Sequence, residues 1–309
     1  MNFIVFPGQG SQKIGMGKDL SDNFLEAKHV FEEVNDALNF NLTKIMWEGS
    51  DSEISLTTNA QPALMACGVA AFRVLSKIKN KNISELANFA CGHSLGEYTA
   101  LTVAEVFSLK NSAILLRLRG EAMQKAVPVG EGAMAALIGI NINKTKEIIQ
   151  KVQIHGVCDV GNDNAEGQVV ISGEKKAVEK AIELSKISGV KRAVLLPVSA
   201  PFHCRLMEPA RVIMEEALND LEFDVPLIPI ISNISAAAHS DPEELKKNLI
   251  DQITGTVRWR ETMHLADNFG IEKITELGSG KVLTGISKRM FKNIFTECYE
   301  NLEDFKNII

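Results

Sequence analysis

Residues 88–98 read NFACGHSLGEY and place the pattern G-x-S-x-G between a short apolar run and a segment with helical periodicity. A serine between a strand and a helix, with a glycine two residues before and two after it, is typical of a nucleophile elbow. The glycines permit a tight turn that holds the Ser94 hydroxyl clear of the backbone, and the dipole of the following helix favours negative charge beside it. The pattern therefore predicts Ser94 as a nucleophile; the alternative is a glycine-rich turn with an idle serine.

Strands and helices alternate on both sides of this turn. Short apolar runs closed by turn residues indicate buried strands, and apolar residues three and four apart indicate helices. The expected order is strand 3–6, helix 19–38, helix 61–75, strand 86–91, a helix from Leu95, helix 208–221, strand 228–232, helix 242–253 and strand 273–277. This alternation predicts an α/β fold with a mainly parallel sheet.

Residues 128–198 follow a different order, in which two helices separate the strands as βαββαβ. The six elements are expected at 133–138, 143–151, 157–160, 168–172, 175–188 and 192–196. This order is typical of a ferredoxin-like unit of roughly 70 residues. We therefore predict that residues 128–198 form a small domain inserted into a larger domain made of 1–127 and 199–309.

Composition and charge exclude several classes of protein. The chain has 309 residues, with 33 Lys and Arg against 39 Asp and Glu, so its formal net charge is −6. This balance disfavours nucleic acid as a partner, because a polyanion would be repelled on average. The longest apolar stretches, such as 63–72, contain about ten residues, whereas a membrane helix needs roughly 18. The N-terminus lacks the basic region of a signal peptide, so a cytoplasmic protein without a membrane partner is expected.

Neither the cysteines nor the other glycine-rich segments predict a metal or cofactor. An odd number of cysteines, at spacings that fit no disulfide framework or zinc pattern, indicates reduced thiols at Cys67, Cys91, Cys158, Cys204 and Cys298. The turn at 8–13 has Lys13 where a dinucleotide-binding motif requires its third glycine. Segment 278–281 is no phosphate loop, because Thr275 replaces the first glycine and Val282 the serine or threonine that binds magnesium.

A serine nucleophile needs a base, and the chain offers six histidines. His203 ends the loop 198–203, just after the insertion rejoins the larger domain, and functional residues concentrate on such loops. His93 adjoins Ser94, but neighbouring side chains on a sharp turn usually point apart, which favours a structural role. The other four are expected at the surface or in the insertion: His29, His155, His239 and His264. These patterns favour His203 as the base and leave His93 as the alternative.

Four motifs carry a resemblance to a known family. They are FPGQGSQ at 6–12, GHSLGEY at 92–98, SAPFH at 199–203 and ELGSGK at 276–281. Together, and in register from Phe3 to about Met290, they resemble the malonyl-CoA:acyl carrier protein transacylases of type II fatty acid synthesis. The resemblance implies an α/β-hydrolase-like large domain with a ferredoxin-like insertion. It also implies transfer of malonyl from malonyl-CoA, through a malonyl-serine, to the phosphopantetheine thiol of acyl carrier protein, with coenzyme A as leaving group and no cofactor.

The resemblance also assigns the reacting groups. It makes Ser94 the nucleophile and His203 the general base and later the acid, with the backbone N–H groups of Gln9 and Leu95 as the oxyanion hole. No carboxylate completes a triad; a backbone carbonyl near Gln252 is expected to orient the histidine ring. This is sufficient because the third group only has to accept a hydrogen bond from the far nitrogen and fix the tautomer.

Substrate-binding residues follow in the same way. Arg119 matches the arginine that binds the malonyl carboxylate, whose two oxygens suit the paired donors of a guanidinium. Arg117 lies two positions earlier and about 200° around the same helix, so only one of them can face the site. Gln61 and Asn162 match residues that line the acyl pocket. The alternatives are that Gln61 begins a helix and Asn162 shapes a turn at 162–167, where the family more often has a serine-proline pair.

The sequence leaves two alternative functions open and predicts one surface for docking the carrier protein. A serine hydrolase or thioesterase would use the same serine and histidine with water as acceptor, and a non-catalytic scaffold would need neither. Because carrier proteins of this family are strongly acidic, docking requires a local basic patch. Segment 277–292 has a local charge of +4 and contributes Lys281, Lys288 and Arg289, while the insertion contributes Lys191 and Arg192. The alternative is an ordinary solvated helix face.

Overall fold

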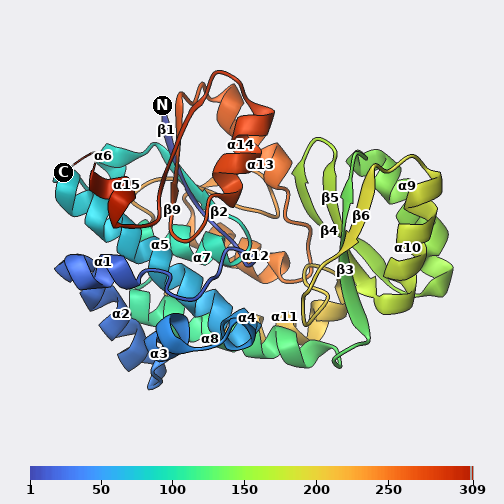
Figure 1. Ribbon diagram of the computed structural model, residues 1–309, viewed down its shortest axis with the longest axis horizontal. Helices are drawn as coiled ribbons and strands as arrows, with labels where there is room; N and C mark the ends of the chain where they lie inside the picture. The colour runs from blue at the N-terminus through green and yellow to red at the C-terminus, as the bar shows by residue number, and fades with distance from the viewer. Residues whose placement is uncertain (307, 309) are drawn as a thin grey trace.

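The computed structural model describes residues 1–306 and 308, and it contains two separate β-sheets (Figure 1). The larger sheet has the strand order β10-β9-β1-β2-β7-β8. Its strands are β1 (Asn2–Phe6), β2 (Phe89–Gly92), β7 (Ile230–Ile231), β8 (Ala238–His239), β9 (Lys273–Leu277) and β10 (Phe295–Tyr299). Neighbouring strands are parallel except for β7 with β8. The α/β fold with a mainly parallel sheet is confirmed.

Helices cover both faces of this sheet, which explains the unbroken apolar run in β1. Ile4 and Phe6 pack into the core that includes α5, whereas Phe3 and Val5 pack into the core that includes α13 and α14. The helices outside the small sheet are α1 (Lys18–Asn23), α2 (Leu25–Leu38), α3 (Leu42–Glu48), α4 (Asp51–Ser55), α5 (Thr57–Lys79), α6 (Ile83–Leu86), α7 (Leu95–Val103), α8 (Leu109–Ala126), α11 (Glu208–Asn219), α12 (Pro242–Gln252), α13 (Trp259–Asn268), α14 (Val282–Met290) and α15 (Leu302–Lys306). Among the described residues, none of these helices is long and apolar enough to span a membrane.

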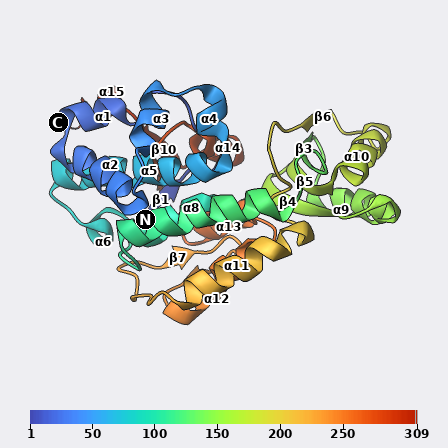
Figure 2. The same ribbon diagram turned by 90° about the horizontal axis from the view of Figure 1, so that it is seen from below.

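The second sheet has the order β4-β5-β3-β6, and all its neighbouring strands are antiparallel. Its elements are β3 (Gly132–Ile138), α9 (Ile142–Val152), β4 (Cys158–Ala165), β5 (Gln168–Glu174), α10 (Lys175–Ile187) and β6 (Arg192–Leu195). Helices α9 and α10 cover one face, and α8 runs along the molecule toward this sheet (Figure 2). Met134 and Val170, on the other face, pack into the core of the larger part. The element order is the expected βαββαβ.

Two expected helices have wrong boundaries. The helix expected at 19–38 is interrupted at Phe24, which is extended and packs its ring 6.0 Å from that of Phe305. The helix expected at 61–75 begins four residues earlier, at Thr57, despite Pro62, and ends four residues later, at Lys79. Proline removes the N–H that would bond the carbonyl of the residue four positions earlier, and the Arg117 guanidinium donates to the carbonyl of Thr58 instead, at 3.4 Å.

Two expected strand boundaries are also wrong. The strand expected at 86–91 begins only at Phe89, because Ile83–Leu86 form a short helix capped by Asn82. The strand expected at 157–160 continues through β4 to Ala165, so Asn162 lies in a strand rather than in a turn. Strand pairing explains why β4 is longer than expected. Asn162 forms a β-bridge with Val257 outside the small sheet, next to a shift in the register between β4 and β5 after Val160.

Candidate active site

Ser94 occupies a strained turn between β2 and α7. Its φ of 55° and ψ of −112° lie outside the regions that serine readily adopts. A Cβ on Gly92 would lie 1.9 Å from the carbonyl carbon of Gly96, and a Cβ on Gly96 would lie 2.3 Å from the carbonyl oxygen of Phe6. Both glycines are therefore required by the space between β1, β2 and α7.

His203 contacts the serine hydroxyl directly. Its Nε2 lies 2.7 Å from Ser94 Oγ, and its Nδ1 lies 2.9 Å from the backbone carbonyl oxygen of Gln252. Because a carbonyl only accepts, Nδ1 carries the proton and Nε2 is free to take the hydroxyl proton. Burial, together with the positive charge of Arg119, lowers the pKa of His203 to about 3. The ring is therefore neutral at pH 7, as a base must be.

Two backbone N–H groups beside Ser94 are available for a substrate oxygen. Gln9 and Leu95 line the same cavity as Ser94, and neither N–H donates a hydrogen bond to any residue that the structure describes. The N–H of Ser94 itself is engaged, because it donates to Asn233 Oδ1 at 2.7 Å. Leu95 begins α7 and Gln9 lies in the loop after β1, and two unengaged backbone donors at one cavity suit an oxyanion hole.

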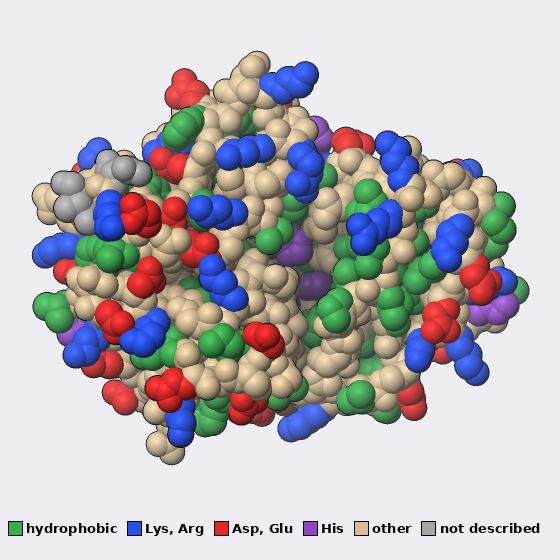
Figure 3. All heavy atoms as spheres, viewed as in Figure 1, with side chains coloured by type: hydrophobic (Ala, Val, Ile, Leu, Met, Phe, Trp, Pro, Cys, Tyr) green, Lys and Arg blue, Asp and Glu red, His purple; other side chains and the backbone are tan. Residues whose placement is uncertain are grey.

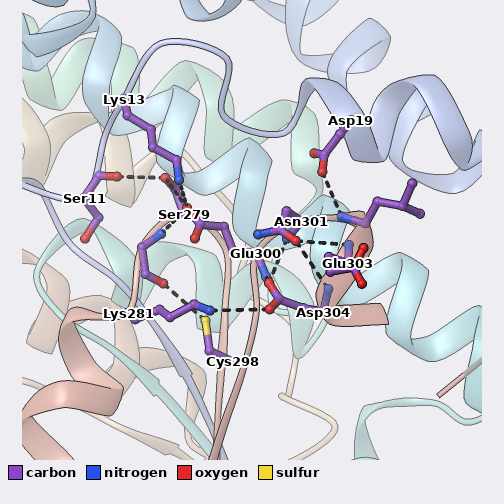
Figure 4. A network of polar contacts seen from close by, with 12 residues as sticks. Ser11, Lys13, Asp19, Ser279, Lys281, Cys298, Glu300, Asn301, Glu303 and Asp304 are labelled. Carbon is purple, nitrogen blue, oxygen red and sulfur yellow. Dashed lines mark hydrogen bonds and ion pairs between the residues drawn. The ribbon is translucent and has the colours of Figure 1, made fainter. Parts of the chain in front are cut away.

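The loop that carries Gln9 is held by the C-terminal part of the chain (Figure 4). Ser279 Oγ donates to the carbonyl of Ser11 at 2.7 Å, and Lys13 Nζ lies 2.6 Å from Glu300 Oε1. The same carboxylate accepts from the N–H of Gly280 at 2.8 Å. The ELGSGK motif therefore has a structural part in this site, since it fixes the loop on which Gln9 lies.

Arg119 is 1% exposed and faces Ser94 from α8. Its Nη1 donates to Gln61 Oε1 at 2.6 Å, and its Nη2 donates to Gln252 Oε1 at 2.8 Å and to Ser94 Oγ at 3.2 Å. Arg117 turns away and donates to Asn59 Oδ1 at 2.7 Å. The polar contacts of Arg119 with the described residues are thus to neutral groups, and burial lowers its pKa. A buried guanidinium without a carboxylate partner suits an anionic group of a substrate.

These groups surround a cavity of about 260 Å³ between the two sheets. Figure 3 shows a hollow between the two parts of the molecule, with histidine side chains at its floor. The polar lining includes Gln61 and Asn162, as expected, and the apolar lining consists of Leu95, Met123, Met134, Leu196, Pro197, Val198 and Phe202. A cavity of this size, charged at one end, suits a short acyl group with a negative end.

His93 also lines the cavity but points elsewhere. Its Nε2 lies 2.8 Å from Asn164 Oδ1 in β4, and its ring packs 5.5 Å from that of Trp259. Burial lowers its pKa. His239 and His264, expected at the surface, are half-buried.

Sequence reasoning missed Asn233 and Glu97. Asn233 Nδ2 donates to the carbonyl of Gly92 at 2.7 Å, so this one amide holds the backbone on both sides of the turn. Glu97 accepts from the N–H of Asn233 at 3.0 Å. Glu97 belongs to the GHSLGEY motif, but the sequence did not indicate which residue it would contact. The sequence around Asn233 contains no motif, and its only signal is that it follows an expected strand.

All five residues expected to dock a carrier are exposed. Lys191 and Arg289 line one surface cavity, and Lys and Arg side chains gather on both sides of the hollow in Figure 3. Lys281 instead forms an ion pair with Asp304 at 3.4 Å. On the folded surface Asp304 of α15 therefore offsets one of the four positive charges of segment 277–292.

None of the five cysteines lines the cavity around Ser94. All five cysteines are free thiols, four of them buried and Cys298 half-buried. Within the described part of the chain, no group of three or more His, Cys, Asp or Glu side chains is placed to hold a metal ion.

Comparison with known proteins gives the family. The model of the acyl transferase domain family matches residues 3–293. The malonyl CoA-acyl carrier protein transacylase of Bacillus subtilis (strain 168) is 42% identical over 294 residues, which are 95% of this chain and 91% of that protein. The chain therefore belongs to the malonyl CoA-acyl carrier protein transacylase family of acyl transferases, as the four motifs indicated.

Solved structures agree with this assignment. The acyl-carrier-protein-S-malonyltransferase from Bartonella henselae has a TM-score of 0.96 and 49% identity, covering 99% of this chain and 97% of that one. A type II PKS acyl-carrier protein in complex with its malonyl-transacylase gives a TM-score of 0.95 and 36% identity, covering 99% of this chain and 98% of that chain.

Proposed function

We propose that this protein transfers malonyl from malonyl-CoA to the phosphopantetheine thiol of acyl carrier protein through a malonyl-Ser94 intermediate. The observation that carries the proposal is the buried guanidinium of Arg119, 3.2 Å from the Oγ of a serine that also lies 2.7 Å from His203 Nε2. The relatives named above are transacylases of this specificity, and one of them is a complex with a carrier.

The first half-reaction acylates the serine. His203 Nε2 takes the proton of the Ser94 hydroxyl while Oγ attacks the thioester carbonyl, and the N–H groups of Gln9 and Leu95 stabilise the oxyanion. The carbon–sulfur bond then breaks, and the departing coenzyme A thiolate takes the proton from His203. Arg119 binds the malonyl carboxylate and keeps the acyl group in place.

The second half-reaction reverses these steps with a different thiol. The carrier thiol gives its proton to His203 and attacks the acyl-serine, and Ser94 leaves with that proton. The chemistry needs no cofactor, because both substrates are thioesters or thiols and every proton moves through the histidine. The backbone carbonyl of Gln252 holds the ring in the required tautomer throughout.

The competing functions share part of this site. A thioesterase would discharge the acyl-serine with water, and a scaffold has no use for the Ser94–His203 pair. Incubation with malonyl-CoA followed by intact-protein mass spectrometry tests all three. We expect a malonyl adduct on Ser94 that holo-carrier protein discharges much faster than buffer does. Rapid discharge by buffer would indicate a hydrolase, and the absence of an adduct would contradict acyl transfer.

Arg119→Ala is expected to change selectivity as well as rate. Loss of the guanidinium leaves the malonyl carboxylate desolvated without a partner, which costs about 2–5 kcal/mol, or roughly 30-fold and more in kcat/KM. Acetyl-CoA has no such carboxylate, so its use should fall less or rise. Acylation rates with both substrates measure the effect, and Arg117→Ala is the matched control on the same helix. An equal loss for both substrates would make Arg119 structural.

The fold supports a finer classification. We infer that residues 128–198 form a ferredoxin-like domain inserted into an α/β-hydrolase-like domain made of 1–127 and 199–309. The antiparallel order β4-β5-β3-β6 with two helices on one face supports the ferredoxin-like insertion. The turn at Ser94, between a strand and a helix, supports the α/β-hydrolase-like domain. We also propose that the protein acts in the cytoplasm, as expected for an enzyme of type II fatty acid synthesis.

The carrier docks, in this proposal, on exposed cations of α14 and of the insertion. Arg289 Nη2 donates to Gln168 Oε1 at 3.3 Å, which places the end of α14 against the hairpin between β4 and β5. Arg289 and Lys191 line one surface cavity, and we include their exposed neighbours in the chain, Lys288 and Arg192, in the proposed basic surface. The ion pair with Asp304 removes Lys281 from this surface.

Charge reversal tests the docking surface. The double variant Lys288→Glu and Arg289→Glu is expected to slow transfer to the carrier and to make it less salt-sensitive, while acylation by malonyl-CoA stays near normal. Lys79→Glu with Lys81→Glu is the matched control, because both lysines are exposed: Lys79 ends α5, roughly 27 Å along that helix from Gln61, and Lys81 lies two residues beyond it. Unchanged carrier transfer would remove α14 from the docking surface.

A further inference from the structure

A buried carboxylate lies behind the reacting groups and takes no part in the bond-making steps. Glu97, on α7, has no exposed surface. Its Oε2 accepts from Gln252 Nε2 at 2.7 Å and from the N–H of Asn233 at 3.0 Å. Gln252 Nε2 also donates to the carbonyl of Ser94 at 3.1 Å. The side chain of Gln252 therefore lies between the carboxyl group of Glu97 and both Ser94 and Arg119.

That side chain, Gln252, serves two reacting groups at once. Its backbone carbonyl accepts from His203 Nδ1, and its side-chain Oε1 accepts from Arg119 Nη2. A side-chain amide has one donating and one accepting end, whereas a carboxylate only accepts. Glu97 therefore fixes Nε2 toward itself and Oε1 toward the guanidinium. The reversed amide would place its NH₂ against the N–H groups of Arg119 and its oxygen against the acceptor oxygen of Glu97.

We propose that Glu97 is a positioning residue which, through the Gln252 amide, fixes Arg119 and thereby sets the preference for carboxylated acyl groups. The inference rests on the proposed function, because it assumes that Arg119 binds the substrate carboxylate. Among the described residues Arg119 has three hydrogen-bond partners, and Gln252 is the one whose amide the buried Oε2 of Glu97 holds in a single orientation.

Three variants of Glu97 test this role. Glu97→Met keeps the length and removes both acceptor oxygens, so the kcat/KM ratio of malonyl-CoA to acetyl-CoA in serine acylation should fall by roughly tenfold or more. Glu97→Gln keeps one acceptor oxygen for both donors and should restore the ratio to within about threefold. If the methionine variant does not fold, Glu97→Asp withdraws the acceptor by one methylene and should lower the ratio in the same direction.

A double-mutant cycle separates positioning from general stability. Gln252→Leu alone should lower the ratio, and Glu97→Met in that background should change it no further, because the interaction runs through the missing amide. Glu276 is the matched control: it is equally buried and accepts from the N–H groups of Leu283 and Thr284 at 3.1 and 2.7 Å. Glu276→Met should lower the thermal midpoint and leave the ratio unchanged.

Three outcomes would overturn the proposal. They are an unchanged ratio in folded Glu97→Met, additive effects of Glu97→Met and Gln252→Leu, and an equal fall in the ratio for Glu276→Met. Failure of the proposed function would look different, because the wild-type protein would then form no malonyl adduct on Ser94.

Discussion

Ser94→Ala is expected to form no acyl-enzyme and to lose transfer activity by roughly 10⁴-fold or more, the scale seen when a covalent nucleophile is removed. The hydroxyl oxygen forms the bond to malonyl, and no neighbouring side chain can replace it, since His203 and Arg119 only contact that oxygen. Intact-protein mass spectrometry after brief incubation with malonyl-CoA measures the adduct, and a discontinuous assay with holo-carrier protein measures transfer.

The matched control is Ser112→Ala, which changes a fully buried serine on α8 in the same way. It should retain both the adduct and transfer. Thermal unfolding of both variants should stay near that of the wild type, because alanine tolerates the turn about as well as serine does. An adduct of normal yield in Ser94→Ala would place the nucleophile at another residue.

The elbow could be predicted from the sequence because its causes are local. Gly92 and Gly96 lie within two residues of Ser94, and the strand before them and the helix after them carry their own apolar patterns. The βαββαβ order of the insertion could be predicted for the same reason. Each of its helices and strands is bounded by turn residues, and its hydrophobic periodicity can be recognised from the local sequence alone.

The rest of the site depends on partners far apart in the chain. Ser94 bonds Asn233 across 139 positions, and Gln252 bonds Ser94 across 158. No local pattern marks such a pair, so the amide network around Glu97 could not be predicted. The same reason explains the helix broken at Phe24 and the pairing of Lys281, since both involve residues near the C-terminus.

His203→Ala is expected to lower the acylation rate by about 10²–10⁴-fold, the usual contribution of a general base. The hydroxyl of Ser94 would keep its position, since Arg119 Nη2 still donates to it, but nothing would take its proton. Stopped-flow or quench-flow measurement of coenzyme A release in the first turnover isolates this step. Because the pKa of His203 is lowered to about 3, the wild-type base is neutral over the whole range near pH 7 in which the comparison is made.

The backbone conformation at His203 determines which control variant should accompany His203→Ala. With φ at 59°, His203 is in the left-handed region, where alanine is strained and asparagine is more readily accepted. His203→Asn should therefore unfold at a higher temperature than His203→Ala while losing the rate to a similar extent. His93→Ala provides the second comparison, because His93 points toward Asn164 rather than Ser94 and should retain most of the acylation rate. A near-normal rate in both His203 variants, with a large loss in His93→Ala, would assign the base to His93.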